Sequence, residues 1–415
     1  LEIQVARCFL RSHGSKTQTK NRKGVTPMSR IISIEIVDFQ FDSPNKERIG
    51  VGQLITYKKG ASIRATKNAI AITTEDGHRG EYVTNWVASP ATRGEMDMLA
   101  PFMIGRNALA REEIYDDLKR EIRQWSGMGH GPLDIALWDL AGKKYNASIS
   151  ELLGGYRNRL PVYASTYLGD DKTGLNCKEA YAEFAEQCYE LGFRAYKIHG
   201  WNEGDARKEA ENVLHVAAMV GDRMTLMLDP ANQLRKFSDA LYVGRACDEG
   251  NYFWYEDPMR DNGKSAFMHQ KLRSMIKTPL LITEYVRGIE PKADFVIAGG
   301  TDFLRVDPEY DHGITGSLRI AHLGEALGLD VEVHACGPAH RHLMSAMRNS
   351  NFYELALVGP DCPNMVAPVY TCGYTDQLDC CGTDGCVQVP TGPGLGVTYD
   401  WNFIRKNAIA TRIYD

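Results

Sequence analysis

The sequence predicts an α/β protein in which a closed barrel of eight parallel strands follows a smaller N-terminal α+β region. From about residue 160, eight short apolar runs alternate with helical stretches. Buried parallel sheets covered by helices show this alternation, and eight such units fit a closed barrel of roughly 200 residues. Before residue 160, short strand patterns are followed by helical ones, as in an α+β unit. A doubly wound open sheet is disfavoured because no glycine-rich phosphate fingerprint follows the first run.

Three short strands and two helices are predicted in the N-terminal region. Alternating apolar residues and turn signals predict strands over 31–41, 50–57 and 69–74, as in a small antiparallel sheet. Apolar residues with helical spacing predict helices over 108–125 and 132–145. Gly154 and Gly155 end the region.

The region from 160 onwards supplies the barrel. Its eight strands are predicted over 161–166, 194–199, 225–229, 252–257, 280–284, 303–307, 330–334 and 352–357. Helical patterns between them include 178–191, 206–220, 237–249 and 316–327.

Residues 1–27 differ from the rest of the chain. They carry a local charge of +5 and no apolar run long enough for a signal peptide. We expect a disordered extension or a cloning remnant, with Met28 as the natural start. A transit peptide is the alternative.

The composition excludes several classes of protein. The 415 residues carry a net charge of −5, with 48 lysines and arginines against 53 aspartates and glutamates. A nucleic-acid binder needs a basic excess facing phosphates, and a membrane span needs about 18 consecutive apolar residues. We therefore expect neither a nucleic-acid nor a membrane partner.

The ten cysteines fall into two groups. Cys8, Cys177, Cys188, Cys247 and Cys336 are scattered, which is typical of free thiols in a reducing compartment, so we expect a cytoplasmic protein. The other group crowds one C-terminal stretch and contains Cys362, Cys372, Cys380, Cys381 and Cys386. Because it has no CxxC pair and no nearby histidine, we expect buried or loop thiols rather than structural zinc.

Every predicted barrel strand after the first carries an ionisable residue at or near its carboxyl end. In chain order these are Lys197 and His199, Asp229, Glu256, Glu284, Asp307, His334 and Glu354. The ionisable residues of successive strands are 20 to 30 residues apart in the sequence, which is about the length of one βα unit. They should therefore converge on the face where barrel active sites lie. One such residue is usually a helix cap or the start of a loop, but seven consecutive strands predict a functional site.

The residue types at these strand ends predict a metal site and an acid/base pair. Asp229, Glu256 and Glu284 suit a hard, oxygen-seeking dication such as Mg²⁺, whereas zinc more often recruits histidine or cysteine. Without a cation the three carboxylates would repel one another. Asp307 and His334 end neighbouring strands, where a carboxylate can orient an imidazole and raise its basicity. A core histidine bonded to a backbone carbonyl is the alternative for His334.

A series of short motifs carries a family resemblance. They are the segments 136–143 and 151–155, Leu228-Asp229, Tyr255-Glu256-Asp257-Pro258, Thr283-Glu284, Arg305-Val306-Asp307, Gly313-Ile314-Thr315-Gly316 and His334. In this order they resemble the enolase superfamily, in the mandelate racemase/muconate lactonizing enzyme family. Within that family the likeness is to the mandelate racemase subgroup, which includes many acid-sugar dehydratases.

The resemblance implies a modified TIM barrel, (β/α)₇β, with an N-terminal α+β capping domain. It places the cap at 28–158, the barrel at 159–365, and a segment that returns to the cap at 366–415. It also implies one Mg²⁺ held by Asp229, Glu256 and Glu284, and removal of the proton α to a carboxylate to give an enediolate. Glu354 matches a carboxylate that hydrogen-bonds the substrate, with a buried ion pair as the alternative.

The chain departs from the subgroup at two positions. The second strand reads Lys197-Ile198-His199 instead of Lys-x-Lys, so Lys197 is expected to bind the substrate carboxylate, and His199 replaces the ammonium base or binds a substrate hydroxyl. Asp307 stands where the cycloisomerase-like branch has a lysine, which sets that branch aside. Asp229-Pro230-Ala231-Asn232 is one residue longer than Asp-x-Asn, so no substrate role is assigned to Asn232.

We therefore expect a Mg²⁺-dependent lyase that dehydrates a sugar acid to a 2-keto-3-deoxy acid, with Asp307 and His334 supplying the acid or the base. A racemase or epimerase that uses His199 and His334 on opposite faces is one alternative. A barrel that binds a metal or ligand without turnover is another. The expected partners are a small anionic substrate and further copies of the chain in a homo-oligomer. Specificity is expected in the cap loops 39–53 and 89–93 and in the cysteine-rich loop.

Overall fold

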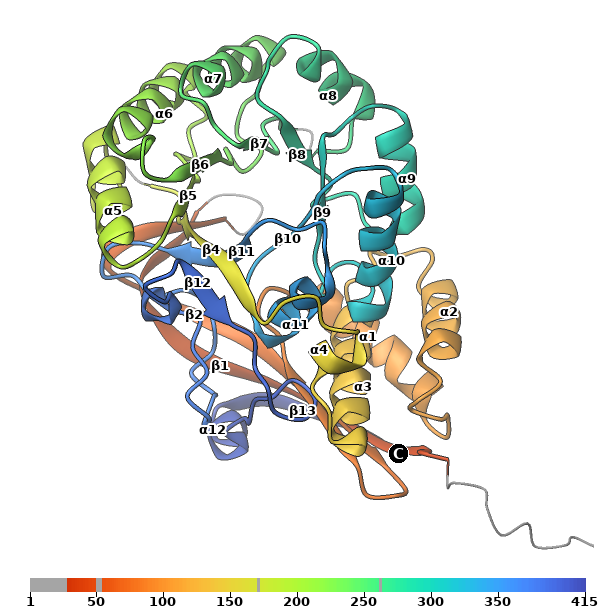
Figure 1. Ribbon diagram of the computed structural model, residues 1–415. Coiled ribbons are helices and arrows are strands. Elements are labelled where there is room, and N and C mark those ends of the chain that lie inside the picture. The colour runs from red at the N-terminus through yellow and green to blue at the C-terminus, as the bar shows by residue number, and fades with distance from the viewer. Residues whose placement is uncertain (1–27, 50–53, 170–171, 261–262) are drawn as a thin grey trace, which may run out of the picture.

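The computed structural model describes residues 28–49, 54–169, 172–260 and 263–415. It consists of a helix-covered barrel and a cap made of a second sheet with its own helices (Figure 1). The extension expected over 1–27 and the first four residues of the strand predicted at 50–57 lie outside the described residues. Within those ranges, no helix combines the length and the apolar character needed to cross a bilayer.

The cap sheet has four antiparallel strands in the order β13-β1-β2-β3. They are β1 (Ile31–Ile49), β2 (Leu54–Thr74), β3 (Arg79–Val83) and β13 (Ala408–Tyr414). The strands predicted at 50–57 and 69–74 belong to one strand, β2. The polar stretch between them is also extended because it pairs with β1. The β1–β2 hairpin reaches the barrel, where Thr56 bridges Leu168.

Four helices follow the cap strands. They are α1 (Pro90–Met103), α2 (Arg111–Glu121), α3 (His130–Tyr145) and α4 (Ile149–Leu152). α1 has no counterpart among the predicted helices. The Ser89 side chain caps it by accepting from the Thr92 N–H at 3.1 Å, and Pro90 suits its first turn. α3 is buried on nearly all sides because it lies between β3 and the barrel helix α10 (Gly313–Ala326).

The barrel has eight parallel strands in the order β10-β9-β8-β7-β6-β5-β4-β11, and it is nearly closed. Its strands are β4 (Arg159–Thr166), β5 (Ala195–Ile198), β6 (Thr225–Leu228), β7 (Trp254–Glu256), β8 (Leu280–Ile282), β9 (Phe303–Val306), β10 (Val331–Val333) and β11 (Tyr353–Val358). The helices around it are α5 (Lys178–Glu190), α6 (Ala206–Val220), α7 (Phe237–Glu249), α8 (Ala266–Arg273), α9 (Ile289–Ile297), α10 and α11 (Pro338–Ala346). The predicted modified TIM barrel with an N-terminal cap is confirmed.

The chain crosses back from the barrel to the cap after β11. β12 (Cys386–Gln388) pairs antiparallel with β4, and α12 (Trp401–Lys406) contacts β1. β13 then pairs antiparallel with β1. The division at 158 and 365 into cap, barrel and returning segment stays a proposal.

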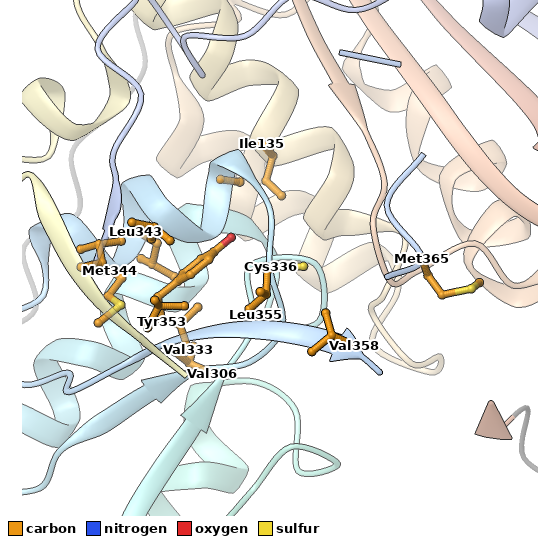
Figure 2. Packing of buried hydrophobic residues seen from close by; sticks show 14 of the residues in the cluster. Ile135, Val306, Val333, Cys336, Leu343, Met344, Tyr353, Leu355, Val358 and Met365 are labelled. Atoms are coloured by element: carbon orange, nitrogen blue, oxygen red, sulfur yellow. The ribbon is translucent and has the colours of Figure 1, made fainter. Parts of the chain in front are cut away.

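Apolar packing fixes the barrel strands that carry the expected acid/base pair. Figure 2 shows Tyr353 of β11 beside Leu343 and Met344 of α11, with Val306 and Val333 nearby. All five side chains are buried. Because Val306 and Val333 immediately precede Asp307 and His334, both polar residues leave a close-packed core and have little freedom to move.

Candidate active site

The three carboxylates predicted to bind a metal converge at the carboxyl ends of β6, β7 and β8. One oxygen from each of Asp229, Glu256 and Glu284 lies within 4.8 Å of the other two. All the donors are carboxylate oxygens, which suits a hard cation such as Mg²⁺. Burial would raise the pKa of Asp229, but the charges of His199 and Lys197 lower it to about 2. This carboxylate is therefore ionised at neutral pH.

Two buried cations neutralise the carboxylates beneath this cluster. The Lys197 ammonium lies 2.8 Å from both Glu256 and Glu354 and 3.5 Å from Asp229. The Arg305 guanidinium contacts the other oxygens of Glu256 and Glu354, at 2.9 and 2.5 Å. Arg305 was not among the predicted site residues. Its signal in the sequence is a single arginine inside an otherwise apolar barrel strand.

The predicted pair of Asp307 and His334 forms. His334 Nδ1 lies 2.6 Å from Asp307 Oδ2, and His334 Nε2 lies 3.6 Å from Glu284. Burial would lower the pKa of His334, but the charges of Glu284 and Asp307 raise it to about 9. The other Asp307 oxygen lies 3.3 Å from Nε2 of His340, a fully buried histidine of α11 that the sequence patterns did not single out.

Two aromatic rings hold the His334 imidazole from the sides. Tyr310 stacks on it with ring centroids 5.3 Å apart, and Trp86 of the cap meets it edge-on at 6.1 Å. The ring is therefore fixed by Asp307, by the barrel and by the cap.

His199, the residue in place of the usual second lysine, also faces the carboxylate cluster. Its Nε2 lies 3.1 Å from Asp229, and its Nδ1 lies 3.3 Å from the Ser165 hydroxyl. The extra residue after Asp229 is absorbed by left-handed backbone at Ala231 and Asn232, with φ of 50° and 60°. Ala231 lines the cavity described next, whereas Asn232 is not among the lining residues.

A cavity of about 810 Å³ lies between the barrel end and the cap. Of the predicted site residues, those that line it are His199, Asp229, Glu284, His334 and Glu354. Lys197, Glu256 and Asp307 are buried behind this lining. The cap adds polar residues to the lining. Gln40, Arg48 and Arg93 lie in the segments 39–53 and 89–93 where specificity was expected, whereas Lys67, Asn85 and Trp86 were not singled out. Sequence reasoning missed these last three because strand and helix patterns do not indicate which cap positions face the barrel.

Left-handed backbone is concentrated beside the site residues. Asp257 follows Glu256 with φ of 33°, Thr283 precedes Glu284 with φ of 93°, and Ala335 follows His334 with φ of 66°. Non-glycine residues rarely adopt such values, and their concentration around a cavity is typical of functional sites.

The cysteines take no part in this arrangement. All nine cysteines in the described ranges are free thiols, and within those ranges no group of them could hold a metal. In the crowded C-terminal group Cys362 is buried, Cys380, Cys381 and Cys386 are partly buried, and Cys372 is exposed.

Comparison with known proteins gives two family matches. Residues 180–403 match the model described as "Enolase C-terminal domain-like", and residues 59–154 match "Mandelate racemase / muconate lactonizing enzyme, N-terminal domain". Among solved structures, D-glucarate dehydratase from Agrobacterium tumefaciens, complexed with magnesium, is 26% identical. It superimposes with a TM-score of 0.80 over 92% of this chain and 100% of that one.

Curated relatives have several activities. D-galactarolactone cycloisomerase of Agrobacterium fabrum is 26% identical over 83% of this chain and 93% of its own length. D-gluconate dehydratase of Thermoproteus tenax is 25% identical over 66% of this chain, which spans only 55% of that enzyme. The relatives thus share a scaffold and differ in reaction.

Proposed function

The chain belongs to the mandelate racemase/muconate lactonizing enzyme family of the enolase superfamily, and from that premise we propose that it is a Mg²⁺-dependent acid-sugar dehydratase. It would remove the proton α to a carboxylate and eliminate the 3-hydroxyl as water, which leaves a 2-keto-3-deoxy acid. The observation that carries the proposal is the Asp307–His334 pair, whose imidazole lines the cavity beside the carboxylate cluster.

Asp229, Glu256 and Glu284 would hold the Mg²⁺. The three carboxylate oxygens within 4.8 Å of one another fit that ion. When bound, Mg²⁺ supplies positive charge that stabilises the negative charge developing on the substrate carboxylate. Beneath the cluster, Lys197 and Arg305 neutralise Glu256 and Glu354 and hold them in place.

His334 supports dehydration because one face of the ring can serve both proton transfers. Its Nδ1 is engaged with Asp307, which leaves Nε2 for the substrate. In its neutral form the ring can accept the α-proton at Nε2 and then deliver that proton to the departing hydroxyl oxygen, while Asp307 stabilises the charged imidazole. Mg²⁺ held by Glu284 would offset the negative charge that raises the pKa of His334. Glu354 and His199 line the same cavity and would orient the substrate carboxylate and a hydroxyl. A direct contact of Lys197 with the substrate stays a prediction, since its ammonium is engaged by three carboxylates.

A screen of sugar acids with Mg²⁺ tests the proposal. We expect at least one acid to give a 2-keto acid, detected as its semicarbazone, and activity to disappear when EDTA removes the metal. If no acid in a set covering the configurations of the four- to six-carbon sugar acids gives a keto acid, the dehydratase proposal is wrong.

The second candidate is a racemase or epimerase. The observation in its favour is that two imidazoles, His199 and His334, line one cavity, as a reaction on two faces of a carbon requires. Incubation in D₂O followed by NMR separates the two candidates. Deuterium at C2 of an inverted, still hydroxylated acid, with no keto acid, would establish racemisation.

A further inference from the structure

The two walls of the cavity differ in charge. Three cations of the cap line it, and among the described cap residues no carboxylate does so; the cations are Arg48, Lys67 and Arg93. The acidic lining residues all come from the barrel: Asp229, Glu284 and Glu354. The cavity thus has a carboxylate-rich barrel wall suited to a metal and a cationic cap wall.

Lys67 is the cation of this wall that is most removed from water. It lies on β2 opposite Phe39 of β1 and is 3% exposed. Within the described ranges, its ammonium donates only to the backbone carbonyl of Asn85, and no carboxylate pairs with it. A buried ammonium is unfavourable unless an anion compensates it. Because Lys67 lines the cavity, a bound ligand can supply that anion.

Glu309, the carboxylate whose charge acts on Lys67, is committed elsewhere. One oxygen of Glu309 accepts from the Tyr82 hydroxyl and the Asn85 N–H at 2.6 Å, and the other accepts from the N–H groups of Trp86 and Val87 at 2.7 and 2.9 Å. These four hydrogen bonds occupy the carboxylate.

The electrostatics of Lys67 agree with this geometry. Burial is the main reason why the pKa of Lys67 falls to about 8, the Arg48 charge lowers it further, and Glu309 acts in the opposite direction. At neutral pH the side chain is therefore still mostly protonated, next to a second cation.

From these contacts we infer that Lys67, together with Arg48, binds a second anionic group at the end of the substrate remote from the reacting carboxylate. The substrate would then be a dianionic sugar acid: a dicarboxylate, or an acid with a terminal phosphate. Which end reacts rests on the proposed function; the anion subsite itself does not.

The test compares matched acids in the presence of Mg²⁺. Galactarate carries two carboxylates and D-galactonate has the same configuration with one; 6-phosphogluconate carries a terminal phosphate and D-gluconate is its match without it. For each, we measure kcat/KM for keto-acid formation and the Kd by calorimetry, with wild type, Lys67→Met and Lys46→Met. Lys46 is a matched control: it is a fully buried lysine of the same hairpin whose ammonium donates to the Pro44 carbonyl at 2.8 Å, and it does not line the cavity.

The inference predicts that wild type prefers a dianionic acid over D-galactonate, and that Lys67→Met reduces this preference by about tenfold or more, because a charge-assisted contact is lost. Lys46→Met should leave the preference unchanged. A preference for galactarate identifies the carboxylate and one for 6-phosphogluconate the phosphate. If Lys67→Met does not fold, Arg48→Gln should reduce the same preference in part.

The failures of the two proposals are distinguishable. If D-galactonate is dehydrated as well as the dianionic acids, or if the preference survives Lys67→Met, the anion subsite is wrong and the dehydratase proposal stands. If no acid reacts, the dehydratase proposal fails and the Kd values decide on the subsite. Tighter binding of a dianionic acid that Lys67→Met abolishes would support the subsite, and equal or absent binding would overturn it.

Discussion

At the residue scale, charge pairing decides which side chains stay available to a substrate. Lys197 and Lys67 are both buried, but three carboxylates surround Lys197, whereas Lys67 donates to a backbone carbonyl at the edge of a cavity. His334 has one ring nitrogen engaged by Asp307 and the other directed toward Glu284. A buried lysine thus supports the structure at position 197 and, in our proposal, binds a ligand at position 67.

We predict that Glu256→Gln weakens Mg²⁺ binding by about tenfold or more, because a charged ligand is lost while Lys197 and Arg305 remain with one carboxylate fewer to balance them. Titration calorimetry measures the Kd. Glu332→Gln is the control, since Glu332 is also a buried barrel glutamate but lies outside the cluster. An unchanged Kd in Glu256→Gln would remove Glu256 from the metal site.

We predict that His334→Asn lowers kcat by about 10³-fold or more, because it deletes the proton carrier while keeping a similar size. Asp307→Asn should lower kcat less, since the imidazole is retained. His322→Asn, on the exposed side of α10, should leave kcat unchanged. Steady-state kinetics on the acid found by the screen provides the measurement. A His334→Asn enzyme with near wild-type kcat would exclude His334 as acid or base.

At the element scale, α11 connects the site to the rest of the molecule. It brings His340 to 3.3 Å from Asp307, behind the pair that faces the cavity. Two residues later, His342 Nδ1 accepts from the Ser150 N–H at 3.1 Å, and Nε2 donates to the Leu395 carbonyl at 3.0 Å. One helix thereby holds α4 and the C-terminal segment together next to the site.

The two hydrogen bonds of His342 make this junction sensitive to acid. Burial, the main cause, lowers the pKa of His342 to about 4, whereas an unfolded histidine titrates near 6.5. Below pH 6.5 His342 becomes protonated in the unfolded state but stays neutral in the folded state. The contribution of His342 to the free energy of unfolding is therefore fully present above pH 6.5. This contribution to the free energy of unfolding falls by about 2 kcal/mol by pH 5 and by about 3 kcal/mol once the pH is below 4.

We predict that His342→Gln is less stable than wild type at pH 7.5, and that the gap in melting temperature narrows as the pH falls to 5. Melting curves across this range measure the gap. His322→Asn, which changes an exposed histidine, should show no such narrowing. A gap that stays constant would show that His342 titrates alike in both states.

At the scale of the whole molecule, the returning C-terminal segment holds the cap against the barrel. β13 covers the outer edge of β1. Its Arg412 donates two hydrogen bonds to the Asp38 carboxylate, at 2.9 and 3.0 Å. Asp38 is 3% exposed, and Arg93 lies 3.6 Å from it as a second cationic partner. The cap wall, with Lys67 and Arg93, is positioned through this sheet.

We predict that Arg412→Gln lowers the free energy of unfolding by about 2–3 kcal/mol, because the buried carboxylate of Asp38 loses the nearer of its two cationic partners. The melting temperature should fall and KM should rise, while the Kd for Mg²⁺ at the barrel site should change little. Arg405→Gln, which breaks the exposed contact with Glu35 at 3.3 Å, should change stability by less than about 1 kcal/mol. Equal effects of the two substitutions would contradict this role of β13.

The sequence by itself predicted the barrel, the metal cluster and the acid/base pair. It could do so because strand ends recur with the period of one βα unit, and parallel strands bring their carboxyl ends to one rim. Asp229, Glu256, Glu284, Asp307 and His334 each follow from that repeat. The family motifs added the cap and the chemistry.

Only the tertiary structure decided which of these residues face the cavity and what lies opposite them. Lys197 is drawn under the carboxylates by Glu256 and Glu354, and Arg305 joins it. Lys67 reaches the cavity because β2 continues through a polar stretch that pairs with β1. The physical reason is that these positions depend on contacts between segments far apart in the chain, and no local spacing of residues encodes such contacts.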